Sequence, residues 1–328
     1  LPSVNFYASG QANSAAALIA GGLAHRGEEP AIVYAAENNN HAAEIVRDAI
    51  AEHLSAPLPR HVQFLNTVIG KMSRVVTDPA EIASLNLTPI APGIGRAFLV
   101  EEFNRILVSK TTIPGFLPGI QVFVEKDNLL PFEEAKLYGH NAIHALLGFV
   151  GALKGYAKMT ELANDKPLMH VAREAFIRES GGALIHKHAS LGDELFTESG
   201  YQRYADDLLR RMTNPFLADT TERAARDILR KLGAADRIFG TMSLALEWGV
   251  RPASMAVGAL AGVAMLLGNV ARHGVPNEFH GIGWQSLDRA GLADLLRWVW
   301  KNKEPPFRNE LIDSTWQATD RLTELVRP

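Results

Sequence analysis

The chain changes character at residues 111–119, TTIPGFLPG, which contain two Pro-Gly pairs. Such pairs mark turns, because proline fixes one backbone dihedral angle and glycine adopts conformations that other residues avoid. Before this segment, short apolar runs alternate with helical patterns, and after it the pattern is helical almost to the end. Since 328 residues are enough for two domains, we predict an α/β domain over residues 1–120 and a mostly helical domain over residues 121–328.

The first domain has the pattern of a parallel sheet. Strands and helices alternate over residues 3–10, 14–26, 30–38 and 42–54. Alternation at this spacing predicts parallel strands, with ligands bound at their carboxyl ends, where Gly10 and Asn38 lie. Residues 62–76 and 96–110 are strand-rich, and we expect them to extend the sheet or to form hairpins beside the cleft.

Composition excludes several kinds of site. The chain has no cysteine, so it carries no disulfide, zinc–thiolate site, iron–sulfur cluster or thiol nucleophile. Its 33 basic and 36 acidic residues give a net charge of −3, which provides no general attraction to nucleic acid or to an anionic membrane. Leu1 opens no secretory signal, and together with the lack of cysteine this leads us to expect a cytoplasmic location.

One uncharged segment, residues 252–271, is about long enough to span a bilayer. It consists largely of alanine and glycine, which gain little from lipid, and it includes Ser254 and Asn269. We therefore predict a buried core helix and no membrane partner.

Residues 136–144, KLYGHNAIH, place an amine, an amide and an imidazole on about two turns of one predicted helix. On an α-helix, Asn141 lies about 140° and His144 about 80° around the axis from Lys136. A lysine whose pKa is lowered by burial takes the proton of an alcohol near neutral pH, and an amide donor stabilises the alkoxide. An imidazole orients the hydroxyl or the amine. Each residue also has an ordinary explanation, as a solvated lysine, a locally bonded asparagine or a core histidine.

The same segment has a competing interpretation as a metal site. His140 and His144 stand at the i, i+4 spacing of metal ligands, and His186 and His188 form a second pair. The glutamate of the H-E-x-x-H motif and an obvious third ligand are both missing. We therefore predict no metal site.

With its flanks, EEAKLYGHNAIHALLGFVGALKGY, this segment resembles the signature of the polyol-specific long-chain dehydrogenases, the family of mannitol 2-dehydrogenase and mannitol-1-phosphate 5-dehydrogenase. The resemblance covers essentially the whole chain. It implies a partial Rossmann-type sheet followed by a helical substrate domain. It also implies a metal-independent, NAD- or NADP-dependent oxidoreductase of class EC 1.1.1 that interconverts a sugar alcohol, or its phosphate, and the ketose. Lys136 is then the general base, Asn141 stabilises the alkoxide and His144 orients the hydroxyl or Lys136.

A second polar element is NPFLADTTERAARDILRKLGAADR, residues 214–237. Asp219 and Glu222 fit the start of a helix of capping-box type. On that helix three arginines fall within about 60° of one another, at positions 223, 226 and 230. A solvated charged face explains such a stripe, but the segment also resembles the sugar-phosphate branch of the family. That resemblance implies substrate contacts from Arg223 and Lys231, which suit a phosphate or carboxylate.

The Gly-rich fingerprint of dinucleotide binding, G-x-G-x-x-G, is absent. The resemblance offers a reason, because the strands at residues 3–10 and 30–38 come late in the family's nucleotide domain. We therefore expect the fingerprint, and the residues that distinguish NAD from NADP, to precede Leu1. By the same resemblance, Ser9 and Gly10 match the strand end that passes the cofactor, and Asn38 lies at the junction of cofactor and substrate. A smaller α/β domain that never bound a dinucleotide is the alternative.

One segment departs from the family pattern. Where the family has Val-Asp-Arg-Ile, with an aspartate that hydrogen-bonds sugar hydroxyls, this chain has Ile69-Gly70-Lys71-Met72. The lost acceptor is expected to weaken or redirect polyol binding, and the added charge is compatible with a sugar phosphate or hexuronate. Two alternatives stay open, a hexuronate reductase and a non-catalytic sugar-phosphate-binding protein.

Overall fold

The computed structural model describes residues 14–37, 40–102 and 105–327. The chain folds into two compact units. Unit 1 comprises Leu1–Ser73 and Val100–Glu133, and unit 2 comprises Arg74–Leu99 and Glu134–Pro328. Each unit is made of two separate stretches of the chain. The domains expected over residues 1–120 and 121–328 stay a prediction.

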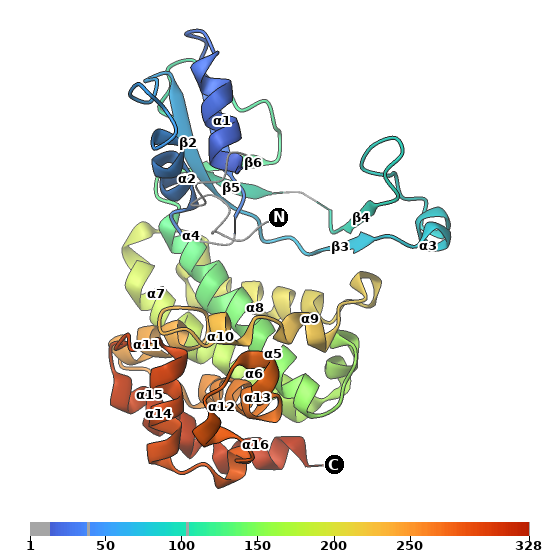
Figure 1. Ribbon diagram of the computed structural model, residues 1–328, viewed down its shortest axis with the longest axis vertical. Coiled ribbons are helices and arrows are strands. Elements are labelled where there is room, and N and C mark those ends of the chain that lie inside the picture. The colour runs from blue at the N-terminus through green and yellow to red at the C-terminus, as the bar shows by residue number, and fades with distance from the viewer. Residues whose placement is uncertain (1–13, 38–39, 103–104, 328) are drawn as a thin grey trace. The chain divides into compact units, whose positions relative to one another are not determined.

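Unit 1 is an α/β unit built on a four-stranded sheet with the order β1-β2-β5-β6 (Figure 1). Its elements are α1 (Ala15–Ala24), β1 (Ala31–Ala35), α2 (Ala42–Ala51), β2 (Val62–Val68), β5 (Ile106–Ser109) and β6 (Phe123–Lys126). β1 and β2 are parallel, as are β5 and β6, whereas β2 and β5 are antiparallel. The sheet is therefore mixed, with the predicted parallel pairing in each half.

Helices α1 and α2 lie where the apolar spacing predicts them. Ser14 begins α1 by accepting a hydrogen bond from the N–H of Ala17. The two helices share one apolar core, to which they contribute mainly Ala16, Ala20, Leu23, Val46 and Ile50. The strand predicted over residues 3–10 lies outside the described residues.

Unit 2 contains a two-stranded sheet and the helices of the second half of the chain. The sheet pairs β3 (Ser73–Val76) with β4 (Ala97–Val100), and α3 (Pro79–Ser84) lies between them in sequence. A short helix, α4 (Leu130–Glu134), spans the point in the sequence where unit 1 ends and unit 2 resumes. The longer helices of unit 2 include α5 (Ala142–Leu153), α6 (Lys166–Glu174), α7 (Gly182–His188), α8 (Glu198–Met212), α11 (Phe239–Glu247), α12 (Ala253–Gly268), α14 (Arg289–Val299), α15 (Arg308–Gln317) and α16 (Thr319–Val326). Short helices are α9 (Thr221–Ala225), α10 (Ile228–Lys231), α13 (Val270–His273), η3 (Met159–Asn164), η5 (Ala189–Leu191), η6 (Glu194–Phe196), η7 (Pro215–Leu217), η8 (Asn277–Phe279) and η9 (Trp284–Ser286).

The core of unit 2 is organised around α12, which packs against α5 and α15. Most of its side chains are buried, as predicted for residues 252–271. Its first turn is stabilised by Glu179, whose carboxylate accepts hydrogen bonds from the N–H groups of Ser254 and Met255. No helix among the described residues combines the length and the apolar character needed to cross a bilayer.

Two π-helices, η2 (Ala135–Asn141) and η4 (Ala175–Gly181), pack against each other in this unit. Each contains a glycine that faces Tyr201, whose hydroxyl oxygen lies 2.9 Å from Ser180 Oγ. A Cβ atom at Gly139 would lie 2.7 Å from the Tyr201 oxygen and 2.8 Å from Phe176. Glycine is required there because no larger residue fits between the helix backbone and these rings.

We expect Gly139→Ala to lower the free energy of unfolding by about 1–3 kcal/mol, because the added methyl group forces the buried rings to move. Gly182→Ala is the matched control, since its Cβ would meet its nearest neighbour, Val250, at an ordinary 3.6 Å. Urea unfolding of both variants measures the difference. Equal stability of the two variants would contradict the close packing at Gly139.

Candidate active site

Lys136 and Asn141 are the second and last residues of η2, and both are half-buried. The α-helical geometry expected for this segment is wrong here. In a π-helix the N–H of residue i+5 bonds to the carbonyl of residue i. Two residues that are five apart in the sequence are therefore separated by about one turn of the helix. Lys136 and Asn141 therefore share one side of the helix, where an α-helix would set them about 140° apart.

The start and middle of η2 are held by side chains from other helices. Glu134, which directly precedes it, is buried and accepts a hydrogen bond of 2.8 Å from the Lys187 ammonium group. Its other oxygen lies 2.7 Å from His188 Nε2. The Thr241 hydroxyl lies 3.0 Å from the carbonyl oxygen of Tyr138 and can donate its proton to it. These contacts fix the backbone that carries Lys136.

His144 lies in the first turn of α5, about 60° around the helix from Asn141. Its Nε2 is 3.0 Å from Asp219 Oδ2, and the Asp219 side chain is 4% exposed. Burial lowers the pKa of His144, and the hydrogen bond and charge of Asp219 oppose this shift only in part. The imidazole is therefore mainly neutral at neutral pH.

Asp219 also binds Arg223. The guanidinium group donates from Nε to Oδ1 at 2.5 Å and from Nη2 to Oδ2 at 2.6 Å. Although burial raises the pKa of Asp219, the hydrogen bonds from His144 and Arg223 outweigh it and hold that pKa well below its ordinary value. The helix start assigned to Asp219 is wrong, since Thr220 caps α9 by accepting the N–H of Arg223. Asp219 instead joins α9 to α5.

The continuous basic stripe expected over residues 223–230 is broken. α9 ends at Ala225 and α10 starts at Ile228, with Asp227 between them in the left-handed conformation at φ 62°. Arg223 is 48% exposed and paired with Asp219. Arg230 lies 3.6 Å from Asp227 and 3.8 Å from Asp236, both carboxylate contacts.

Lys231 is buried, at 5% exposure, and its ammonium group donates to the carbonyl oxygen of Ala224 at 2.5 Å. Burial lowers its pKa to about 7, and the positive charges of Arg237 and Arg230 add to this effect. Lys231 therefore stabilises the end of α9 from inside the unit.

His140 is also buried, on η2, and no hydrogen-bond partner is found for its Nδ1. Burial, with the charges of His144 and Lys136, lowers its pKa well below the ordinary value. Within the described part of the chain, no group of three or more histidine, aspartate or glutamate side chains is arranged to hold a metal ion.

The predicted cofactor residues Ser9, Gly10 and Asn38 lie outside the described residues. Gly70, the departure from the family pattern, lies just after β2 in unit 1, and a Cβ atom there would meet nothing within 4 Å. A larger side chain therefore fits at this position.

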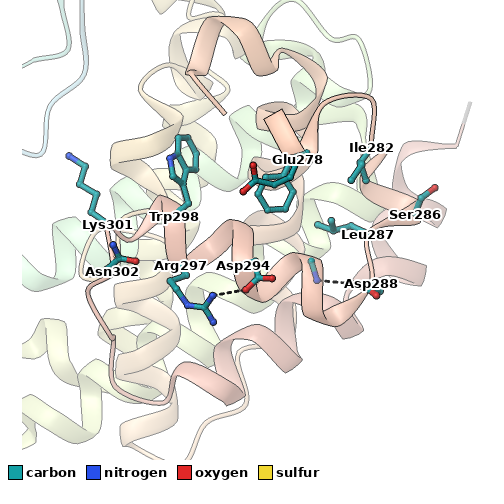
Figure 2. A pocket seen from close by; sticks show the side chains of 12 residues that line it. Glu278, Ile282, Ser286, Leu287, Asp288, Asp294, Arg297, Trp298, Lys301 and Asn302 are labelled. Atoms are coloured by element: carbon teal, nitrogen blue, oxygen red, sulfur yellow. Dashed lines mark hydrogen bonds and ion pairs between the residues drawn. The ribbon is translucent and has the colours of Figure 1, made fainter. Parts of the chain in front are cut away.

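A pocket of about 840 Å³ lies between α14 and the loops at η8 and η9 (Figure 2). Its lining includes the aromatic side chains of Trp298 and Phe279. It also includes charged side chains that bind one another, such as Arg297, which donates a hydrogen bond to Asp294. Asp288 accepts the N–H of Gly291 at the start of α14. None of the predicted site residues lines this pocket.

Comparison with known proteins identifies the family to which the helical unit is similar. A family profile described as "Mannitol dehydrogenase C-terminal domain" matches residues 128–294, which include Lys136, Asn141, His144, Asp219, Arg223 and Lys231. The chain belongs to the mannitol dehydrogenase family. This confirms the resemblance drawn from residues 136–144 and their flanks.

Individual relatives agree with that membership. A mannitol-1-phosphate 5-dehydrogenase of Arthrobacter sp. (strain FB24) is 32% identical over 251 residues, which are 75% of this chain and 60% of the relative. The chain therefore spans less than two thirds of that relative's length.

Two solved structures share the fold. A D-sorbitol dehydrogenase in substrate-free form has a TM-score of 0.69 at 18% identity, over 96% of this chain and 66% of the other. A ternary complex of Pseudomonas fluorescens mannitol 2-dehydrogenase with NAD and D-mannitol has a TM-score of 0.67 at 20% identity, over 99% of this chain and 68% of the other. The expected combination of a Rossmann-type sheet and a helical domain is confirmed.

The buried Lys231 gives a testable effect of pH on stability. Between about pH 7 and pH 10.5 the unfolded chain binds a proton at Lys231 that the folded chain does not, so this group makes stability rise with pH over that window. Replacing Lys231 with methionine removes this dependence. We expect the stability of Lys231→Met relative to the parent to be highest below pH 7 and to fall as pH rises.

Urea unfolding at several pH values measures this difference. Lys166→Met, at an exposed position of the same unit, is the control and should show no such trend. A relative stability of Lys231→Met that stays constant with pH would contradict the lowered pKa.

Proposed function

We propose that this protein is an NAD- or NADP-dependent oxidoreductase of class EC 1.1.1 that interconverts a sugar alcohol, or its phosphate, and the corresponding ketose. The observation that carries the proposal is the π-helical turn η2, which sets Lys136 and Asn141 on one side, with His144 about 60° further on. Family membership over residues 128–294 supports it. So do the names of the relatives, a mannitol-1-phosphate 5-dehydrogenase and a mannitol 2-dehydrogenase solved with NAD and D-mannitol.

The described part of unit 1 fits a nicotinamide cofactor. Parallel strands β1 and β2, connected through α2, form the βαβ arrangement that binds nucleotides at its carboxyl edge. Asn66, near the end of β2, accepts the N–H of Ala43 in the first turn of α2, so this chain's own side chain caps that helix. The proposed contacts to the cofactor are Ser9, Gly10 and Asn38. When bound, a nicotinamide cofactor would supply the acceptor for the hydride that leaves the alcohol carbon.

The residues of the chain supply the proton chemistry. The Lys136 amine takes the hydroxyl proton as the carbon–oxygen double bond forms, and in the reverse reaction the ammonium group returns it. The Asn141 amide donates a hydrogen bond to the oxygen while it carries negative charge. His144 orients the hydroxyl or Lys136 through a hydrogen bond.

Arg223 is better placed than Lys231 to bind an anionic group of the substrate. Asp219 accepts hydrogen bonds from two of the five N–H groups of Arg223, and the Arg223 side chain is half exposed. The remaining N–H groups are enough to bind a phosphate or carboxylate. Lys231 is buried and already donates to Ala224. We therefore propose a sugar phosphate as substrate, bound mainly by Arg223, with Lys231 supporting the end of α9 that carries the segment around Arg223.

The substrate assignment is tested by nicotinamide oxidation in the full-length protein with fructose 6-phosphate, fructose and a hexuronate. We expect turnover with the phosphate. Turnover with the hexuronate alone would agree with the proposed mechanism but would contradict the assignment of a sugar phosphate as substrate. Absence of turnover with all three, in a folded protein that binds the cofactor, would contradict the proposed function.

Lys136→Ala tests the general base. We expect kcat/KM for the preferred substrate to fall by about 10²- to 10⁴-fold, because the reaction then loses its proposed general base. Lys166→Ala, at an exposed position in the same unit, should keep full activity. Steady-state kinetics measures both variants, with circular dichroism as a check of folding. Substantial residual turnover in folded Lys136→Ala would exclude this residue as the base.

A further inference from the structure

Asp219 is a buried carboxylate with several donors directed at its two oxygens. Oδ2 lies 3.0 Å from His144 Nε2 and accepts from Arg223 Nη2. Oδ1 accepts from Arg223 Nε and from the backbone N–H of Thr220. An ionised carboxylate only accepts hydrogen bonds, so the hydrogen between Asp219 and His144 belongs to Nε2.

The backbone around Asp219 is fixed as well. Its carbonyl oxygen accepts the N–H of Met159 at 2.9 Å, and the adjacent Thr220 pairs with Lys158 in a short antiparallel bridge. Thr220 also caps α9. The carboxylate therefore has a defined position relative to α5, which carries His144.

We propose that Asp219 is a positioning residue that holds His144 as the tautomer with hydrogen on Nε2. The other ring nitrogen, Nδ1, is then an acceptor. With the function proposed above, on which this consequence rests, His144 receives a hydrogen bond from the reacting hydroxyl or from the Lys136 ammonium group. It cannot donate to the ketone oxygen, and the donors there are the Asn141 amide and the Lys136 ammonium group.

The charged surroundings agree with a neutral imidazole in this role. Burial opposes protonation of His144 and lowers its pKa, Asp219 favours protonation in part, and the charges of Arg223 and Lys231 add smaller opposing effects. His140 and Lys136 lie on the preceding turn of η2. A second hydrogen on the ring would remove the acceptor at Nδ1.

The test is ¹⁵N NMR of the full-length protein labelled at histidine, with His144→Gln to identify the His144 signals. We expect the parent protein to show hydrogen on Nε2 and a bare Nδ1 between about pH 7 and pH 8. In Asp219→Asn the neutral amide both donates and accepts, so the Nδ1–H tautomer should appear. The value of kcat should fall by about 10- to 100-fold, with a smaller change in KM.

Asp206→Asn is the matched control, because Asp206 accepts two hydrogen bonds from Arg173 in the same unit and no histidine among the described residues bonds to it. It should leave both the tautomer and kcat unchanged. Hydrogen on Nδ1 in the parent protein would overturn the proposal, and this measurement requires no variant. A retained Nε2–H tautomer with unchanged kcat in Asp219→Asn would also overturn it.

Failure of the proposed function would look different. The parent would then show the Nε2–H tautomer, and Asp219→Asn would disturb it, while neither protein oxidised or reduced any sugar of the panel. That result would support the assignment of the His144 tautomer, and it would contradict the proposal that this tautomer acts in sugar oxidation or reduction.

Discussion

The contact of Gly139 with Tyr201 and Phe176 is the constraint on which the candidate site depends. At this point the backbone of η2 approaches two aromatic side chains so closely that a Cβ atom has no room. π-Helices are rare and appear mostly as single turns within α-helices, frequently at functional sites. Here η2 packs against a second π-helix, η4, whose Gly181 approaches the ring carbons of Tyr201. The altered turn aligns Lys136 with Asn141, so the packing of the core determines the geometry of the polar groups.

Buried charge is the second feature that organises this unit. Asp219, Lys231 and Glu179 are all largely buried, and each is stabilised by directed hydrogen bonds. A buried charge without such partners costs several kcal/mol, which makes these contacts sensitive to substitution. Asp219 connects α9 to α5, Glu179 begins α12, and Lys231 closes the end of α9. The charges therefore fix the relative placement of helices within unit 2, which in turn positions His144.

Much of this arrangement could be predicted from the sequence. The capping Ser14, the parallel β1 and β2, and the buried α12 follow from local patterns that depend on residues near one another. The π-helical turn could not, because the close packing that accompanies it joins Gly139 to Tyr201, which lie far apart in the sequence. The role of Asp219 was missed for the same reason. Its neighbour Glu222 suggested a helix cap, whereas its partner His144 is 75 residues away.

The central claim is that Lys136, Asn141 and His144 act on one hydroxyl group. A crystal structure of the full-length protein with a nicotinamide cofactor and a bound sugar alcohol, or its phosphate, tests this most directly. We predict that the amine, the amide and Nδ1 of the imidazole all lie within about 3.2 Å of the reacting oxygen or of one another. We also predict that Asn141 and Lys136 remain one π-helical turn apart. A reacting hydroxyl bound away from Lys136, or an α-helical turn that separates Lys136 from Asn141, would contradict the claim.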